Sequence, residues 1–314
     1  MIKIMYPSKL KIGDEIRVIA PSRSLSVVRE DVYNNANKFL KEKGYNITFS
    51  DNSREIEYDE SASIKSRVED LHNAFLDNNV KAILTSIGGF NVNQILEYID
   101  YSIIMNNPKI ICGYSDITAL LNAIHAKTGL ITYHGPHFCS FGFGNNRNYT
   151  YEYFEKCVNS DSEYKITPSF EANRYVVIQD GNCEGTVIGG NLCTLNLLQG
   201  TEFMPKMKDV ILFIEDDNIM GKYFIGEFER NLQSLLQIDK CKINGVVFGR
   251  FSDDCNLTVD KITQIVKSKR QLKNIPIIFN TDFGHVFPFV TFPIGGTVTI
   301  AAKADCVDIV FKQH

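Results

Sequence analysis

The sequence predicts an α/β protein with two domains, and three observations lead to this expectation. Short apolar runs alternate with amphipathic helical patterns in the first half, which is typical of a parallel sheet with crossover helices. From about residue 174 onward, strand-like segments dominate and only a few helical patterns lie between them. The length of 314 residues suits one large or two medium domains. We place the boundary near residue 165, which gives domains of residues 1–165 and 166–314.

The first half shows its elements in regular order. Strands are predicted at 16–22, 45–50, 82–90 and 109–115, and helices at 27–43, 61–78, 93–100 and 116–129. Gly129 is expected to end the last of these helices, since glycine readily adopts the left-handed conformation found there. Segment 139–154 is rich in Gly, Asn and aromatic residues and lacks a clean period, so we expect a boundary or an active-site loop.

The second half is predicted to be a β-rich domain. Helices are expected only near 191–199, 225–237 and 258–271. The strand-like segments are YVVIQDG, EGTVIGGN, DVILFIED, INGVVFGRF, IPIIFNTDFGH and GTVTIAAKADCVDIVF.

Composition excludes several classes of protein. The formal net charge is −4 and no long run of one sign occurs, which argues against a nucleic-acid partner. No apolar stretch approaches the roughly 20 residues of a membrane-spanning helix. Charged residues interrupt the N-terminal segment, unlike a secretory signal, so a cytoplasmic location is expected. The eight cysteines lack zinc-site spacing and are expected to be reduced thiols, and neither a metal nor a cofactor is predicted.

Ser115 is the strongest candidate for a catalytic residue. The apolar strand before it runs through Gly113 and Tyr114 into Ser115 and Asp116, and a helix follows at once. Such a turn exposes a serine nucleophile beside the free N–H groups of a helix N-terminus. Because the second glycine of G-x-S-x-G is absent, a simple helix cap at Ser115 or Asp116 stays an alternative.

A serine nucleophile needs a base and a group that orients the base. Glu215 ends one apolar strand, and His285 follows another within a short turn. Side chains at the carboxyl ends of strands meet at one edge of a sheet, so these two are expected to converge on Ser115. His134 and His137 also follow an apolar segment and remain alternative bases.

The glycine pair Gly88 and Gly89 follows the predicted strand AILTSI, which begins at residue 82. Backbone without side chains approaches a ligand closely, so this turn is a candidate oxyanion hole together with the N–H of Asp116. An ordinary tight turn is the alternative interpretation. The spacing does not fit a dinucleotide fingerprint, which argues against a nicotinamide enzyme.

These motifs occur together and in one order along the chain. The segments are LKIGDEIRVIAPS, SIGGFNVNQILEYIDY, ICGYSDITALLNAI, TYHGP, GGNLCTLNLLQGTEF, LFIEDD and FGHVFPFVTFPIGG. Together they resemble the serine peptidase family of murein LD-carboxypeptidases and microcin-immunity peptidases, from about residue 8 to residue 305.

The resemblance implies a Rossmann-like N-terminal domain, a C-terminal α/β domain with a β-rich core, and an active site in the cleft between them. It implies that Ser115 is the nucleophile, His285 the base and Glu215 its orienting carboxylate. The family's oxyanion donors match the backbone of Gly88, Gly89 and Asp116. A homodimer is also expected from the resemblance.

The resemblance leaves the substrate open. The GGFN turn and the LFIEDD segment look more like the microcin-immunity branch, which cleaves an aminoacyl or peptidyl nucleotide, than the murein branch, which removes a terminal D-alanine. A ligand-binding module without activity is a third possibility. Arg250 is a candidate for a substrate carboxylate, and Asn191 and Phe90 are further candidates for substrate binding. Because the chain has no Trp, a nucleotide base would stack on another aromatic residue: Phe138, Phe141, Phe143 or Tyr149.

Overall fold

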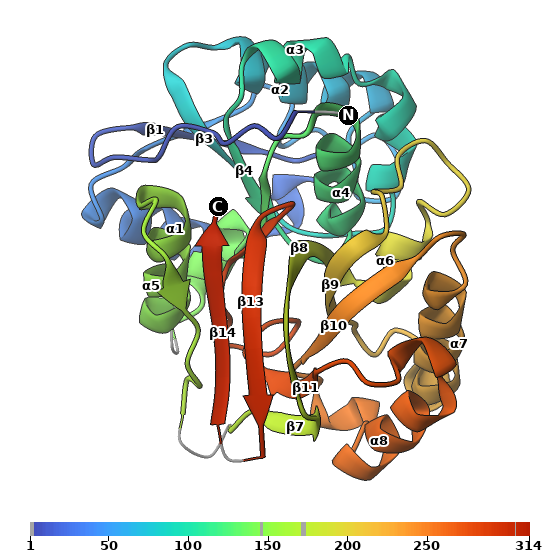
Figure 1. The fold of residues 1–314 in the computed structure, drawn as a ribbon. Coiled ribbons are helices and arrows are strands. Elements are labelled where there is room, and N and C mark those ends of the chain that lie inside the picture. The colour runs from blue at the N-terminus through green and yellow to red at the C-terminus, as the bar shows by residue number, and fades with distance from the viewer. Residues whose placement is uncertain (1–2, 145–146, 171–173, 305) are drawn as a thin grey trace.

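The computed structural model describes residues 3–144, 147–170, 174–304 and 306–314, and two sheets organise them (Figure 1). One sheet has six strands in the order β12-β5-β4-β3-β1-β2, and the other has eight in the order β6-β14-β13-β8-β9-β10-β11-β7. The predicted two-domain α/β fold is confirmed.

The first sheet is parallel except at one edge. Its strands are β1 (Glu15–Ile19), β2 (Asn46–Phe49), β3 (Val80–Thr85), β4 (Ile110–Gly113), β5 (Thr132–His134) and β12 (Phe292–Ile294). Strand β12 comes from the C-terminal half and pairs antiparallel with β5. A boundary at residue 165 therefore assigns five strands of this sheet to the first domain and leaves β12 in the second.

Helices cross over between these parallel strands as predicted. They are α1 (Glu30–Glu42), α2 (Ile64–Leu76), α3 (Tyr101–Asn106) and α4 (Ile117–Thr128). Gly129 ends α4 with a φ of 78°, so the predicted glycine cap is confirmed. The predicted helix at 93–100 is instead a 3-10 helix, Val92–Tyr98, followed directly by α3.

The expectation of a loop over 139–154 is wrong. A 3-10 helix covers Phe138–Gly142, and α5 (Arg147–Asn159) follows. Helix α5 buries Tyr151, Phe154 and Val158, which share one helix face. Its aromatic and Asn residues have modest helix propensity, so tertiary packing rather than local preference stabilises it.

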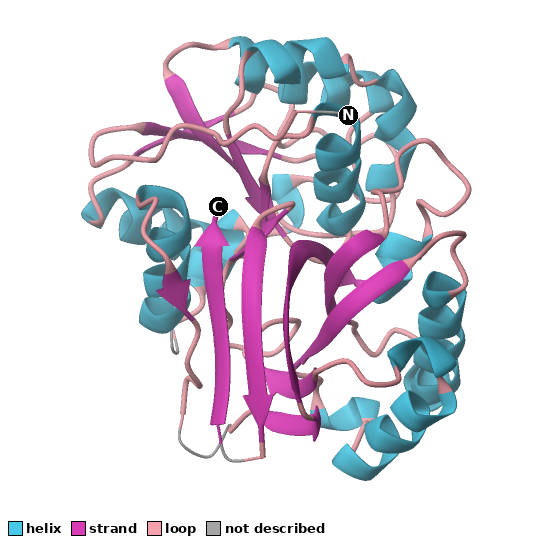
Figure 2. Cartoon of the chain, viewed as in Figure 1, coloured by secondary structure: helices cyan, strands magenta, loops and turns pink. Residues whose placement is uncertain are grey.

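The second sheet is mixed. It contains β6 (Tyr164–Lys165), β7 (Val176–Gln179), β8 (Gly181–Asn191), β9 (Lys208–Glu215), β10 (Lys242–Gly249), β11 (Ile277–Thr281), β13 (Thr297–Lys303) and β14 (Cys306–Gln313). Strands β8 to β11 are parallel, and β13, β14 and β7 pair antiparallel. The helices are α6 (Leu192–Asn196), α7 (Phe224–Leu236) and α8 (Val259–Ser268). Figure 2 shows α7 and α8 along one side of this sheet.

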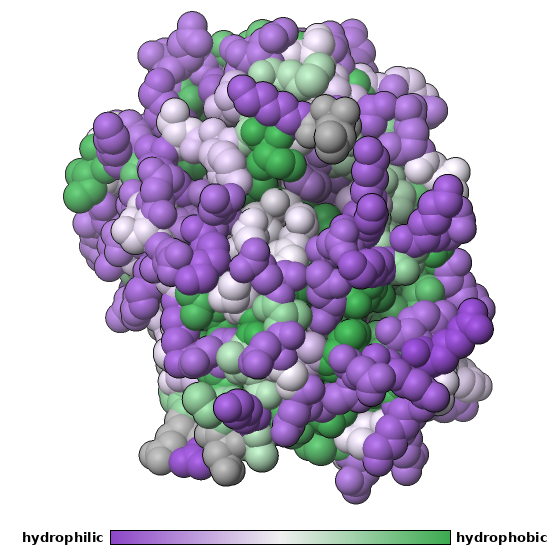
Figure 3. Space-filling model, viewed as in Figure 1, coloured by the Kyte–Doolittle hydropathy of each residue, from purple (hydrophilic) through white to green (hydrophobic). Residues whose placement is uncertain are grey.

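Both sheets share one interior. A single cluster of buried apolar side chains extends along the chain from Leu10 to Phe311 and includes residues of β3, β4, β9 and β10. Polar side chains cover most of the face in Figure 3, and apolar ones lie between them in small groups. The shared core holds the strand ends of the two sheets in fixed positions.

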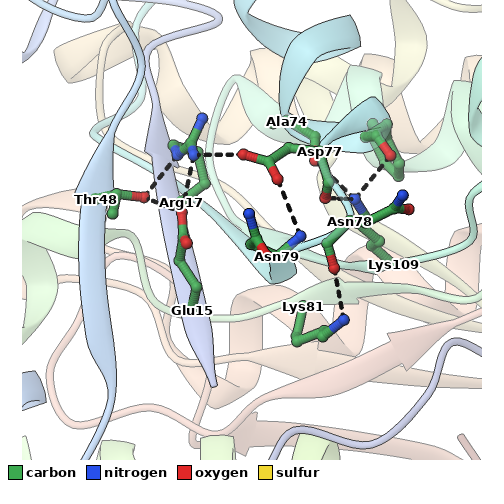
Figure 4. Close-up of polar contacts among 10 residues, drawn as sticks. Glu15, Arg17, Thr48, Ala74, Asp77, Asn78, Asn79, Lys81 and Lys109 are labelled. Carbon is green, nitrogen blue, oxygen red and sulfur yellow. Dashed lines mark hydrogen bonds and ion pairs between the residues drawn. The ribbon is translucent and has the colours of Figure 1, made fainter. Parts of the chain in front are cut away.

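A polar cluster closes the amino ends of the first sheet's strands (Figure 4). Arg17 Nη2 donates to Glu15 Oε1 at 2.8 Å and to Asp77 Oδ2 at 3.0 Å. The Lys109 ammonium donates to the carbonyl of Asp77 and to two carbonyls of the last turn of α2. A helix leaves its last carbonyls unpaired, so Lys109 satisfies groups that otherwise lack a partner.

Candidate active site

Ser115 lies in a tight turn between β4 and α4, at the carboxyl end of the first sheet. Its φ is 60°, a left-handed conformation that is uncommon for a residue with a Cβ. A Cβ added to Gly113 would lie 2.3 Å from Thr85 Oγ1, so position 113, just before the turn, requires glycine. This is the backbone geometry of a strand-to-helix elbow that projects a serine out of a sheet.

The structure brings Ser115, His285 and Glu215 together. His285 Nε2 lies 3.0 Å from Ser115 Oγ, and His285 Nδ1 lies 2.7 Å from Glu215 Oε2. Glu215 is the last residue of β9, and His285 lies in the loop that follows β11. The carboxyl ends of β4, β9 and β11, which belong to two sheets, therefore bring together three side chains joined by hydrogen bonds.

Glu215 and His285 each stabilise the charged form of the other. Burial by itself would raise the pKa of Glu215, but the charge of His285 and the two histidine rings beside the carboxylate, His134 and His285, lower that pKa to about 2. Burial would lower the pKa of His285, but Glu215, aided by Asp217 and Asp216, raises it to about 9. An ionised Glu215 accepts the Nδ1 proton of His285 and leaves Nε2 to face Ser115.

The turn at Gly88 and Gly89 packs directly against the elbow. A Cβ added to Gly88 would lie 3.0 Å from Ser115 Oγ, and one added to Gly89 would lie 2.3 Å from Ser22 Oγ. The close approach leaves no room for a Cβ at Gly89 and little room for one at Gly88. The Asp116 carboxylate accepts from Ser22 Oγ at 2.5 Å and from Val92 N at 2.9 Å, which anchors the start of α4.

The two alternative histidines have other contacts. His134 is fully buried, its ring stacks on Phe292 at 4.5 Å, and its Nε2 lies 3.8 Å from Glu215 Oε1. His137 Nδ1 lies 2.7 Å from Thr85 Oγ1. Among the hydrogen bonds of the described residues, Ser115 Oγ pairs with His285 and with neither of these rings. The geometry therefore favours His285 as the base, and His134, named from the sequence as an alternative base, lies instead beside Glu215, a position that the sequence did not predict.

A pocket of about 170 Å³ opens beside Ser115. Phe90 and Asn191, both predicted to bind substrate, line it, and Phe90 is 63% exposed. Asn191 caps α6 through its side-chain oxygen and donates to Asp216 Oδ1 at 3.0 Å. Burial and the charges of Glu215 and Asp217 raise the pKa of Asp216 to about 8.

The contacts of Arg250 favour a structural role over the predicted binding of a substrate carboxylate. The Arg250 side chain is buried and its Nη1 pairs with Asp282 Oδ1 at 2.7 Å. Its Nη2 donates to the carbonyls of Val286 and Pro288, which flank the His285 turn. With these bonds formed, Arg250 fixes the loop that carries His285 and does not present a free cation to a ligand.

Two of the four aromatic candidates for base stacking are wrong. Phe138 and Phe141 are fully buried in the core. Tyr149 donates its hydroxyl to the carbonyl of Thr167. Phe143 is 44% exposed and packs edge-on against Phe287, two residues after His285, with ring centres 5.7 Å apart. Of the four, Phe143 therefore offers the most accessible ring beside the His285 loop.

Within residues 3–144, 147–170, 174–304 and 306–314, no group of three or more His, Cys, Asp or Glu side chains is arranged to hold a metal ion. The helices of the same ranges include none with the length and apolar character needed to span a membrane. All eight cysteines are free thiols.

A two-domain α/β fold with a serine at such an elbow is typical of serine hydrolases, and comparison with known proteins makes the class specific. A family model described as the LD-carboxypeptidase N-terminal domain matches residues 16–135, and the LD-carboxypeptidase C-terminal domain matches residues 184–300. A putative carboxypeptidase of Bacillus subtilis, YocD, is 46% identical over 99% of this chain and 100% of its own length. The chain belongs to the LD-carboxypeptidase family of serine peptidases.

Relatives from both branches of the family match nearly the whole chain. The crystal structure of an MccF-like protein from Bacillus anthracis superimposes with a TM-score of 0.96 at 47% identity, covering 99% of this chain and 100% of that one. The microcin C7 self-immunity protein MccF in complex with aspartyl sulfamoyl adenosine gives a TM-score of 0.86 at 29% identity over 99% of both chains. A probable murein peptide carboxypeptidase of Bacillus subtilis is 30% identical over 92% of this chain and 89% of its own.

Proposed function

We propose that this chain is a serine hydrolase with a Ser115-His285-Glu215 triad that cleaves the acyl bond of an aminoacyl or peptidyl nucleotide, as in immunity to microcin C. The three hydrogen-bonded side chains, with His285 Nε2 3.0 Å from Ser115 Oγ, carry this proposal. The similarity to the MccF-like structure at a TM-score of 0.96 supports the choice of substrate class.

The mechanism follows from the positions of the three side chains. Neutral His285 takes the proton of Ser115 Oγ as that oxygen attacks the carbonyl carbon, and Glu215 stabilises the imidazolium through Nδ1. Backbone N–H groups of Gly88, Gly89 and Asp116 are the proposed donors to the resulting oxyanion. His285 then protonates the leaving nitrogen, and a water molecule, deprotonated by His285, hydrolyses the acyl-enzyme.

A murein carboxypeptidase is the second candidate function. It is favoured by the murein relative, which matches 92% of this chain. The same triad would cleave the amide bond before a terminal D-alanine. The binding pocket beside Ser115, rather than the triad, distinguishes these two substrates.

The test is turnover by wild type and Ser115→Ala, followed by mass spectrometry. The substrates are aspartyl and lysyl sulfamoyl adenosine and a murein tetrapeptide that ends in D-alanine. We expect Ser115-dependent release of a free amino acid from an adenosine derivative. Release of D-alanine alone would favour the murein function, and an absence of Ser115-dependent product from all three would contradict the proposed hydrolase and favour a binding module.

A cytoplasmic location and a homodimer, both expected from the sequence, also belong to this proposal. Light scattering of the purified protein tests the dimer, and a monomer at micromolar concentration would contradict it. Fractionation of cells that express the full-length protein tests the location.

A further inference from the structure

The pocket beside Ser115 combines apolar walls with carboxyl groups. Its apolar side chains are Phe90, Leu197, Ile219, Met220 and Phe224. Its acidic side chains are Asp116, Asp216, Asp217 and Glu227. Among the described residues that line the pocket there is no Lys or Arg. A group that enters this pocket therefore meets negative charge without a compensating cation in the lining.

The four carboxyl groups differ in their hydrogen-bond and ion-pair partners. Asp116 is held by Ser22 and Val92, and Asp216 by Asn191. Asp217 Oδ1 accepts from the backbone N–H of Ile219, and Asp217 Oδ2 lies 3.5 Å from His285 Nε2.

Glu227 lies on α7, with its side chain 17% exposed. Its Oε2 pairs with Arg230, whose own side chain is 72% exposed, and its Oε1 accepts from Asn231 Nδ2 at 3.2 Å. Burial raises the pKa of Asp217, and burial together with the charges of Glu215 and Asp217 raises that of Asp216 to about 8, so Asp216 is largely protonated at neutral pH. Asp217 and Glu227 keep part of their side-chain surface exposed, whereas Asp116 and Asp216 are buried, so Asp217 and Glu227 are the carboxylates that a ligand can reach.

The position of the pocket beside Ser115 suits the acyl side of a scissile bond. Ser115, Gly89 and Asp116 belong to its lining, so it adjoins the nucleophile and the proposed oxyanion donors. Among the described residues, His285 does not line it. The leaving group must stay close to His285 to receive its proton, so the side chain of the acyl residue is the part placed to enter the pocket.

We propose that this pocket selects an acyl residue with an aliphatic side chain that ends in an ammonium group and disfavours one that ends in a carboxylate. The inference rests on the proposed function and names its substrate class. Leu197, Ile219 and Met220 cover the aliphatic stem, while Asp217 and Glu227 attract the charged end. A carboxylate in the same place is repelled by both groups and loses its hydration. The preference would be opposite to that suggested by the aspartyl ligand bound to MccF.

The experiment compares three derivatives of sulfamoyl adenosine whose acyl residue is lysine, norleucine or glutamate. Norleucine keeps the four-carbon stem of lysine and lacks its charge. We expect kcat/KM of wild type to be about tenfold higher for lysyl than for norleucyl, and lowest for glutamyl. A glutamyl value equal to or above the lysyl value would overturn the inference while leaving the hydrolase function intact.

A pair of variants on α7 tests the residue assignment. Glu227→Gln should lower the ratio of lysyl to norleucyl kcat/KM, since it removes one of the two attracting charges. Glu229→Gln is the matched control, because Glu229 pairs with Lys269 and does not line the pocket. The control should keep the wild-type ratio. An unchanged ratio in Glu227→Gln would contradict the role of Glu227.

A binding measurement separates this inference from the hydrolase proposal. Calorimetry with Ser115→Ala measures the affinity of the three derivatives without turnover. If wild type cleaves none of them but Ser115→Ala binds the lysyl derivative more tightly than the glutamyl one, the inference stands and the hydrolase function fails. If cleavage depends on Ser115 but the three derivatives bind Ser115→Ala with equal affinity, the hydrolase function stands and the inference about the acyl residue fails.

Discussion

The two ends of the first sheet are both rich in buried polar groups, yet they differ in how those groups are satisfied. At the amino end, Lys109 donates to three carbonyls and Arg17 to two carboxylates. At the carboxyl end, Glu215 Oε1, His137 Nε2 and both ring nitrogens of His134 are buried and have no hydrogen-bond partner among the described residues. The polar groups of the amino end are satisfied by hydrogen bonds to one another, whereas these atoms of the carboxyl end find no such partner in the described part of the chain and lie near a pocket.

The difference shows why buried charge by itself does not identify a site. Burial lowers the pKa of Lys109 to about 8, while the pKa of Glu215, which burial alone would raise, is lowered to about 2 by His285 and His134. What distinguishes the carboxyl end is the positive φ of Ser115, the close approach of Gly88 and the adjoining pocket. Mutations at the two ends should therefore separate activity from stability.

The largest effect is expected at the carboxyl end. Ser115→Ala removes the proposed nucleophile, so turnover should fall by about 10⁴-fold or more. The melting temperature should change little, because the variant loses a single hydroxyl. Rates from mass spectrometry and thermal unfolding by circular dichroism check both expectations. Retained turnover would refute the role of Ser115.

Arg250→Lys tests the loop that carries His285. Lysine keeps the charge but cannot contact Asp282 and the carbonyls of Val286 and Pro288 together. We expect kcat to fall by about tenfold through misplacement of His285, with a small change in KM. A rise in KM with unchanged kcat would instead support the substrate-binding role that the buried contacts disfavour.

At the amino end, Lys109→Met should affect stability alone. Removal of the ammonium leaves buried carbonyls of α2 without a donor, at a cost of about 1–3 kcal/mol in the free energy of unfolding. Urea unfolding measures this cost, and kcat/KM of the folded protein should equal that of wild type. A loss of turnover in the folded variant would show that the two ends are coupled.

The smallest effect is a shift in pH dependence. Attack by Ser115 requires neutral His285, whose pKa is raised to about 9, so activity should increase as the pH rises toward that value. The charge of Asp217 contributes to the raised pKa, so Asp217→Asn should move the acidic limb of the kcat/KM profile to lower pH. An acidic limb that stays at the same pH or moves to higher pH in Asp217→Asn would argue against this electrostatic role of Asp217.

The same titration has a consequence for stability. The folded-state pKa of His285 lies above its ordinary value of 6.5, so the protonated pair with Glu215 stabilises the folded protein most below about pH 6.5. That contribution is lost as the pH rises through about 9. In Ser115→Ala, which retains His285 and Glu215, the loss can be followed by urea unfolding without turnover.

Local patterns determined much of this protein. Alternating apolar runs predicted the strands and crossover helices of the first sheet, because side-chain periodicity follows backbone geometry over a few residues. The turn after β4 pointed to Ser115, and the ends of β9 and β11 pointed to Glu215 and His285. These three are placed by short segments whose hydrophobic pattern shows where each strand stops.

Tertiary structure alone decided the features that depend on distant contacts. Helix α5 forms where aromatic residues hide the helical period, since packing against the core outweighs local preference. Strand β12 joins the first sheet from residues 292–294, and Arg250 turns inward to Asp282. The pocket's acidic lining comes from the start of α4, the turn after β9 and helix α7. Such pairings join residues far apart in the chain, and no local pattern records which distant partner a side chain will meet.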